Sequence, residues 1–422
     1  MFKAVFIKSI LFFLVFPLLF LTSLVCTSAL AEGDQKEFQA NVFGRWVTVK
    51  PGNPRSVTAW DLGVDISEPP PAGHEIIPLG DLYLWRHPDA RSLFRAQLSG
   101  VFDDVFWARR VEGLGPLEAV LTFTNFTPPI ARSELVNGEE LKSEELLWGY
   151  VRPGFGIGYR EQVYPGNQDN MFAADLILEP GFLFSESGSE TARNFIVPQD
   201  TFEFRAHLEV RWDALSRNLI KLPLSGYAAG SDIVYGYRAN WRNWGINGGQ
   251  AADEGREYAS FTGYFLAAGR APWLNSNHYR CIGALYGGSG YHLDRFSAFR
   301  VGGGPNPLGE EYGSTYRPVL PGSAIREFFP DHYLIMTGEF RWDPLFFASL
   351  GLDASAGWLD RLRGTWTGVV QRNDVLPAVG IRLTTGFFFN TRLQVAYNYN
   401  FGVVRHQSYG GHEITVLFSG KL

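Results

Sequence analysis

The chain reads Phe202-Glu203-Phe204-Arg205-Ala206-His207-Leu208-Glu209-Val210-Arg211-Trp212. Successive side chains of a β-strand point to opposite faces, so one face of this stretch is apolar and aromatic and the other is almost entirely charged. A tilted strand needs about 9–11 residues to cross a bilayer. Strands of membrane barrels turn apolar side chains to lipid and polar side chains to the lumen. The stretch therefore predicts one transmembrane strand of a β-barrel.

The N-terminal residues have the pattern of a secretory signal peptide. Lys3 and Lys8 precede an apolar run over residues 10–25, and the small-residue site Ala29-Leu30-Ala31 follows it. These features predict that residues 1–31 are removed and that residues 32–422 form a single barrel domain. That domain has one cysteine, Cys281, so it cannot form an intramolecular disulfide.

The composition favours strands and excludes a nucleic-acid partner. The net charge of −6 offers no basic footprint for nucleic acid. Aromatic residues make up 15% of the chain and 47 positions are glycine, which suits short turns and aromatic girdles. After the signal peptide no apolar run is long enough to span a membrane as a helix. Insertion into a membrane is therefore expected through strands.

Strand-like runs follow one another along the rest of the chain, with no helical pattern between them. A first hairpin is expected to join 41–50 to 57–66 across the turn at 51–54. Further strands are predicted at 93–108, 117–126, 147–161, 172–184, 202–212, 219–228, 233–242, 258–268, 279–291, 294–301, 333–342, 345–357, 377–385, 391–401 and 411–422. The total is near sixteen, and a sheet of that size with one apolar face is best closed on itself. The predicted fold class is all-β, a closed antiparallel transmembrane barrel of about sixteen strands.

The last two strands carry a further signal. Residues 393, 395, 397, 399 and 401 are apolar or aromatic and alternate with polar ones, and the final run ends at Leu422. A chain that ends inside a strand resembles the C-terminal assembly signal of outer-membrane barrels, although Leu422 stands where an aromatic residue is usual.

From residue 294 onward the chain resembles the barrel of the BamA-type assembly family, the bacterial surface antigens, which includes TamA and two-partner-secretion transporters. The resemblance rests on Asp294-Arg295-Phe296, on Gly302-Gly303, on Ile325-Arg326-Glu327-Phe328 and on 337–344. Further similar segments are 352–357, 379–383 and 393–401. The third of these segments is similar to the family's lumenal loop motif Arg-Gly-Phe, with Glu327 where the family has glycine. The periplasmic POTRA domains of the family are not expected in this short form.

The loop at 303–332 is predicted to fold into the lumen. Strand alternation turns Glu339 inward, and an arginine in a lumen needs anionic partners because an unpaired buried charge is costly. We therefore predict that Arg326 pairs with Glu339 and Asp353, and the resemblance implies the same cluster. Gly302, Gly303 and Phe328 are the family-motif residues of this loop. The alternative is that Arg326 is solvated on an extracellular loop.

The sequence shows no catalytic constellation, so the chain is predicted not to be an enzyme. Residues 287–292, Gly-Gly-Ser-Gly-Tyr-His, lack the last glycine of a nucleophile elbow and read as a turn. His207 is interpreted as a hydrogen-bonded lumenal residue. His406 and His412 lack the carboxylate spacing of a metal site. No metal and no cofactor are expected.

Three functions remain open. The first is a non-enzymatic barrel of the assembly family in the outer membrane of a Gram-negative bacterium, acting in biogenesis or secretion. Its signs would be an anchored Arg326 and a weak seam between the first and last strands, and its partners would be outer-membrane lipid and periplasmic or outer-membrane proteins. The second is a passive porin, in which the loop acts as a constriction. The third is a lipid-modifying enzyme, which needs a serine, a histidine and an acid at the lipid-facing rim.

Overall fold

The computed structural model of the chain describes residues 38–42, 45–49, 56–72, 75–163, 170–218, 220, 222–305, 318–365, 368–386 and 391–421. The predicted signal peptide, residues 1–31, lies outside this set. No helix among the described residues is both long and apolar enough to cross a bilayer. Within the described ranges the helical segments are the short turns η1 (Lys142–Glu144) and α2 (Asp253–Arg256).

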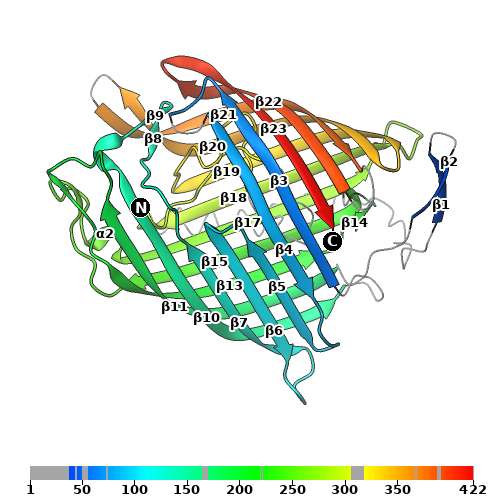
Figure 1. Cartoon of the computed structure of the whole chain (residues 1–422), viewed down its shortest axis with the longest axis horizontal. Coiled ribbons are helices and arrows are strands. Elements are labelled where there is room, and N and C mark those ends of the chain that lie inside the picture. Colours follow the sequence, from blue (N-terminus) through cyan, green and yellow to red (C-terminus); the bar gives the residue numbers. More distant parts are fainter. Residues whose placement is uncertain are drawn as a thin grey trace.

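Sixteen strands, each pairing antiparallel with the next, close into one barrel (Figure 1). In chain order they are β3 (Ser56–Glu68), β4 (Ile76–Arg86), β5 (Ser92–Leu98), β6 (Phe102–Arg110), β7 (Leu117–Phe126), β10 (Leu146–Gln162), β11 (Met171–Ser187), β13 (Thr201–Asp213), β15 (Pro223–Arg238), β17 (Glu257–Arg270), β18 (Tyr279–Tyr291), β19 (His332–Leu345), β20 (Ala348–Thr365), β21 (Gly368–Thr385), β22 (Thr391–Arg405) and β23 (Ser408–Lys421). The two-residue β14 (Ser216–Arg217) adds to β15 at a turn. The predicted all-β closed antiparallel barrel of about sixteen strands is confirmed.

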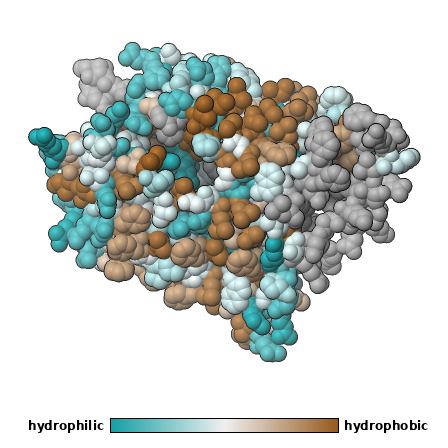
Figure 2. All heavy atoms as spheres, viewed as in Figure 1, coloured by the Kyte–Doolittle hydropathy of each residue, from teal (hydrophilic) through white to brown (hydrophobic). Residues whose placement is uncertain are grey.

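The inner and outer faces follow the alternation of the strands. On β13, Phe202 is 70% exposed and points outward, whereas Glu203 is 2% exposed and points into the barrel. The same alternation holds on β22 and β23, where Phe401 and Phe418 are exposed and Glu413 is buried. Figure 2 shows apolar residues spread over the outer wall in view. Exposed apolar side chains that alternate with inward polar ones are typical of barrels whose outer wall faces lipid.

The connections at the two ends of the barrel differ in length. Four long connections, 127–145, 188–200, 239–256 and 292–331, lie at one end, which we call the loop end. Three of these connections contain short two-stranded sheets. One sheet pairs β8 (Leu135–Val136) with β9 (Glu139–Glu140), and the other pairs β12 (Phe195–Ile196) with β16 (Gly245–Ile246). The start of β3 and the end of β23 both lie at the opposite end, the turn end (Figure 1).

The seam between the first and last barrel strands is fully paired. β23 pairs with β3 over ten residues, from His412 opposite Glu68 to Lys421 opposite Ala59. By contrast, β4 and β5 share only five residue pairs, from Leu82 opposite Leu98 to Arg86 opposite Phe94. The shortest ladder between the described barrel strands therefore lies two strands away from the seam, and a weak seam stays a prediction.

The first hairpin was predicted at the wrong place. β1 (Phe38–Val42) and β2 (Arg45–Val49) pair with each other in a separate two-stranded sheet. β3 is a barrel strand between β4 and β23. The sequence prediction omitted β4 because Pro78 and Gly80 interrupt its apolar alternation.

Three other parts of the prediction do not correspond to single strands. The run 93–108 is two strands, β5 and β6, because Gly100 turns the chain with a φ of +77°. The runs 219–228 and 233–242 are one strand, β15, in which Gly230 does not turn the chain but makes room for the ring of Tyr264. The run 294–301 is not a strand, because the carboxylate of Asp294 accepts the amide N–H groups of Phe296 and Ser297 in a turn.

Candidate functional site

Two flanks of the 292–331 connection pair with each other inside the loop end, and we call residues 301–304 and 319–328 the loop anchor. Val301 and Phe328 exchange two backbone hydrogen bonds of 3.0 and 2.9 Å. The amide of Leu320 donates to the carbonyl of Gly302 at 2.8 Å, and the amide of Gly303 donates to Ala324 at 3.0 Å. The loop anchor is therefore a compact, backbone-bonded unit.

The two family-motif glycines make this close approach possible. A Cβ atom on Gly302 would lie 2.2 Å from the carbonyl oxygen of Ala324, and one on Gly303 would lie 2.0 Å from that of Ser323. No larger residue fits without moving backbone. Phe328, the third family-motif residue, is 7% exposed in an apolar cluster with Val301, Leu320, Tyr333, Ile335, Leu359, Leu376 and Val403.

The loop anchor is bound to the last barrel strand by Glu413. This inward-facing side chain of β23 is fully buried. Its carboxylate accepts the amide N–H groups of Gly304 and of Gly322, the latter at 2.7 Å, and the side-chain amide of Asn398 at 2.9 Å. Hydrogen bonds to a buried carboxylate are among the strong ones in proteins. Glu413 thus holds both flanks of the loop anchor on the seam strand.

A second bond joins the loop anchor to β22. Arg405 at the end of β22 is fully buried and contacts both carboxylate oxygens of Glu327, at 3.1 and 2.7 Å. The same guanidinium donates to the carbonyl of Pro69, in the connection after β3, at 2.9 Å. Glu327, the residue that replaces the family's glycine, is therefore an anchoring residue. Sequence reasoning noted the replacement and did not predict its partner.

The structure brings two of the three predicted anchor residues together. Arg382 on β21 lies 3.1 Å from Glu339 and 2.8 Å from Asp353. The guanidinium of Arg326 lies 5.7 Å from the ring centre of Phe126, and its backbone has a φ of +56°. Pairing of Arg326 with the two acids stays a prediction. The prediction that the whole loop 303–332 folds into the lumen includes residues 306–317, which lie outside the described set. It therefore stays a prediction.

Alternation could have identified Arg382. On β21, Arg382 shares the inner face with Gly380, which pairs with Asp353 in the β20–β21 ladder. The sequence prediction used residues 379–383 only as a family segment and did not ask which acid its arginine would face.

The start of the 292–331 connection is bound to a different part of the wall. Asp294 accepts from Arg238 of β15 at 2.6 Å, and Arg238 also donates to Glu203 of β13 at 3.1 Å. The neighbouring Phe296 packs among Trp148, Trp241 and Trp244. β15 and β23 lie nearly half-way round the barrel from each other. The described parts of this connection therefore make contacts on opposite sides of the loop end.

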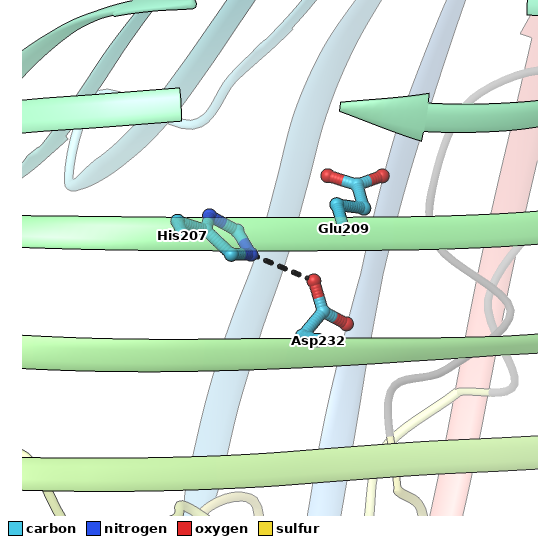
Figure 3. Close-up of side chains that lie close together, drawn as sticks. All are labelled: His207, Glu209 and Asp232. Atoms are coloured by element: carbon cyan, nitrogen blue, oxygen red, sulfur yellow. Dashed lines mark hydrogen bonds and ion pairs between the residues drawn. The ribbon is translucent and has the colours of Figure 1, made fainter. Parts of the chain in front are cut away.

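Charged side chains of the inner wall are arranged in ion pairs, and Figure 3 shows one of them. His207 and Asp232 point toward each other from the neighbouring strands β13 and β15, at 2.9 Å (Figure 3). The other ring nitrogen of His207 lies 3.5 Å from Glu179. The predicted hydrogen-bonded lumenal role of His207 is what the structure shows.

This part of the wall also has the composition of a cation site. His207, Glu209 and Asp232 could each offer a ligand atom, and the three atoms lie within 4.8 Å of one another. The carboxylate of Glu209, however, contacts the guanidinium of Arg211 and lies apart from the His207–Asp232 pair in Figure 3. The group therefore acts in this structure as an ion-paired section of wall.

No family model matches the chain, and no curated protein matches its sequence. Among solved structures, the chain is similar to BamA from Haemophilus ducreyi lacking POTRA domains 1–3, with a TM-score of 0.51 and 10% identity over 92% of this chain and 75% of that one. CdiB from Escherichia coli has a TM-score of 0.49 and 10% identity, over 92% of this chain and 67% of that one. CdiB from Acinetobacter baumannii has a TM-score of 0.45 and 9% identity over 92% of this chain.

The chain spans 65% of the length of the Acinetobacter protein. At these identities the comparison bears on the fold alone. The closed barrel described above, taken with the similarity to the Haemophilus structure, shows that this chain has the fold of the BamA barrel.

Proposed function

We propose that this protein is an outer-membrane barrel of the BamA-type superfamily that acts in outer-membrane biogenesis or secretion of a Gram-negative bacterium. The apolar outer wall supports a location surrounded by outer-membrane lipid. The family motifs between residues 294 and 401 and the shared fold support the superfamily. Periplasmic or outer-membrane proteins would be its partners, and the role itself needs no chemical step.

The observation that carries this proposal is the attachment of the loop anchor to the seam. Glu413 and Arg405 bind the loop anchor to the last two barrel strands, and Arg405 reaches across the seam to Pro69, the residue after the first barrel strand. A pore that only passes solutes needs no link between an inner loop and the seam. A barrel that handles other polypeptides at its wall would use one, because the loop then responds to any change in the pairing of β3 with β23.

A deletion strain tests the proposed role. We expect loss of the gene to lower the amount of at least one folded outer-membrane protein or secreted protein, measured by heat-modifiable gel migration and quantitative proteomics. Wild-type barrel should restore that amount, and a Glu327→Ala/Glu413→Ala barrel should restore less of it while reaching the membrane in equal quantity. An outer-membrane and secreted proteome that is unchanged by the deletion would contradict the role.

The second candidate function is a passive porin. It is distinguished by planar-bilayer conductance of the refolded barrel. The proposed function predicts a small conductance in the wild type that increases in Glu327→Ala/Glu413→Ala, because that double variant frees the loop anchor from the wall. Large, steady conductance that is the same in both proteins would instead favour the porin.

A further inference from the structure

Ser289 and His332 form a hydrogen-bonded pair on the outer face of the barrel. They are directly opposite each other in the β18–β19 ladder, and Ser289 Oγ lies 3.0 Å from His332 Nδ1. The outer face is fixed by the neighbours of His332 on β19, since Met336 is 55% exposed and Ile335 is fully buried. A serine hydroxyl within hydrogen-bond distance of an imidazole nitrogen is the arrangement that activates a serine nucleophile.

The pair lies near the loop end of the outer wall. Ser289 is two residues from the loop-end terminus of β18, and His332 is the first residue of β19. Two exposed aromatic side chains flank this level, Tyr291 on β18 and Trp358 on β20. Aromatic girdles mark the interface of membrane barrels, which is where the carboxylic ester bonds of membrane lipids lie.

Ser289 is 6% exposed, and the strand that carries the imidazole is fixed by a neighbouring carboxylate. Gly287, two residues before Ser289 and therefore on the same face, has no side chain to cover it. The carboxylate of Asp360 on β20 accepts the amide N–H groups of Asp331 and His332, at 2.9 and 3.2 Å. Asp360 thus acts as a positioning residue for the backbone that carries His332.

We propose that Ser289 and His332 are the nucleophile and general base of an acyl-ester hydrolase site that takes the ester-linked acyl chain of a membrane lipid. This activity goes beyond the proposed biogenesis role and requires only that the barrel is in a membrane. The predicted strand over 279–291 does not say which residue of another strand lies opposite Ser289, and the β18–β19 ladder places Ser289 beside a histidine 43 residues later.

The reaction follows from the two side chains. Ser289 Oγ attacks the ester carbonyl carbon while Nδ1 of His332 takes the hydroxyl proton. The tetrahedral intermediate expels the lipid alkoxide, which receives that proton from His332, and an acyl-serine remains. Water then attacks the acyl-serine, gives its proton to His332, and releases a fatty acid as Ser289 regains the proton. Because the strand ladders use the amides around Ser289, preorganised oxyanion donors are scarce and we expect slow turnover.

The test uses the full mature barrel refolded into vesicles of phosphatidylethanolamine and phosphatidylglycerol that carry a labelled acyl chain, with or without lipopolysaccharide. A fluorophosphonate probe should label Ser289, as located by mass spectrometry, and labelled fatty acid should be released. Release from the phospholipid, or of lipopolysaccharide acyl chains, identifies the lipid source. Ser289→Ala should abolish probe labelling and release, and His332→Gln should lower both by roughly 100-fold, the low end of a general base's contribution.

The controls are a buried inward serine and an outward histidine elsewhere. Ser355→Ala on β20 and His412→Gln on β23, whose ring contacts Tyr397, should leave labelling and release unchanged. Heat-modifiable migration shows that each variant is folded and inserted, so a failure to insert is distinguished from a failure of the chemistry. Inserted wild-type barrel that gives no more labelling or no more release than Ser289→Ala overturns the proposal.

Discussion

Glu327 shows how one substitution in a motif changes the way a loop is held. A glycine at this position could contribute only backbone, whereas Glu327 supplies two oxygens to Arg405 and a third contact, at 2.7 Å, to the amide of Ala324. Both members of the ion pair are almost fully buried. Removing one partner of a buried pair costs about 3–5 kcal/mol, because the other charge is left without compensation.

The first residue-scale prediction tests whether Glu413, as in the structure, or Arg326, as predicted from the sequence, holds the loop anchor. Glu413→Gln places an NH₂ group against backbone N–H donors, so we expect the loop anchor to lose about 1.5–3 kcal/mol of local stability. Limited proteolysis should then cut within 301–328 at least tenfold faster than in the wild type. Arg326→Ala should have a smaller effect, and Glu68→Gln, which changes an exposed acid, should have none. Faster cutting in Arg326→Ala than in Glu413→Gln would favour the anchor predicted from the sequence.

The second residue-scale prediction concerns Asp331, in the loop before β19. Burial, and then the nearby carboxylate of Asp360, raise the pKa of Asp331 from 3.8 to about 7. The folded state therefore holds this proton more tightly than the unfolded state, so its contribution to stability is lost as the pH rises from about 4 to 7. The side chain of Asp331→Asn carries no proton that titrates in this range, so the variant should not lose this stability as the pH rises.

Thermal unfolding in detergent measures the effect of Asp331→Asn. The variant should unfold at a higher temperature than the wild type at pH 8 and at nearly the same temperature at about pH 4, since each pKa unit corresponds to about 1.4 kcal/mol. Asp253→Asn, at an exposed loop position, is the matched control. An equal difference between wild type and Asp331→Asn at both pH values would contradict the assignment.

At the scale of elements, the β8–β9 hairpin covers the seam at the loop end. The amide of Ala72, after β3, donates to Gly138 at 2.8 Å, and the amide of His406, after β22, donates to Asn137 at 3.0 Å. The ring of His406 contacts the carbonyl of Pro70 at 2.8 Å and the carboxylate of Glu139. One hairpin therefore links the turns on both sides of the closing ladder.

This contact should depend on pH. The carbonyl of Pro70 and the carboxylate of Glu139 both accept from His406, and they raise its pKa. Only the imidazolium donates to both acceptors, so the contact is complete at low pH and weakens as the pH rises through the raised pKa. Hydrogen exchange of the Ala72 amide, corrected for its intrinsic rate, should accelerate over that range in the wild type. In His406→Gln it should be fast and independent of pH; persistence of the wild-type dependence in this variant would exclude His406 as the cause.

Strand periodicity could be predicted from the sequence, and strand boundaries could be predicted less well. β13 and β22 were predicted well because polar residues alternate in them with apolar or aromatic ones over most of their length. β4 was missed at Pro78 and Gly80, and β15 was split at Gly230, because the sequence alone does not show whether a glycine turns the chain or makes room for a neighbouring ring. The total came close to sixteen because one missed strand and one fused pair nearly offset three extra runs, which are 41–50, the split of β15 and 294–301.

The candidate site was predicted only in part for a related reason. Alternation assigned Glu339, Asp353 and Glu413 to the inner face, but it does not say which residues of a long connection reach them. Arg382 and Arg405 are on neighbouring strands, so their partners depend on register, which a sequence without homologues does not provide. The adjacency of Ser289 and His332 also depends on register. They pair in the β18–β19 ladder, whose two strands are separated in sequence by the connection 292–331.

At the scale of the whole molecule, we expect the barrel wall to open first where its ladder is shortest. The five pairs between β4 and β5 should exchange their amide hydrogens faster than the ten pairs between β23 and β3. Hydrogen exchange with mass spectrometry on the barrel in lipid nanodiscs measures both. If β23–β3 exchanges faster than β4–β5, the seam is the weaker place after all. In Glu413→Gln, exchange at β23–β3 should increase while exchange at β4–β5 stays constant.

The closing ladder also sets the order in which the chain can fold. Thr415 donates to Asp65 across 350 positions of sequence, whereas nearly every other barrel ladder joins strands that follow one another closely. Closing a loop of that length carries the largest entropic cost of any contact in the wall, and it is repaid only when the intervening strands already hold the two edges side by side. The meander from β3 to β23 must therefore assemble as an open, curved sheet first. During that interval both edges present unpaired backbone groups, so the chain depends on its surroundings to keep them from pairing with another chain.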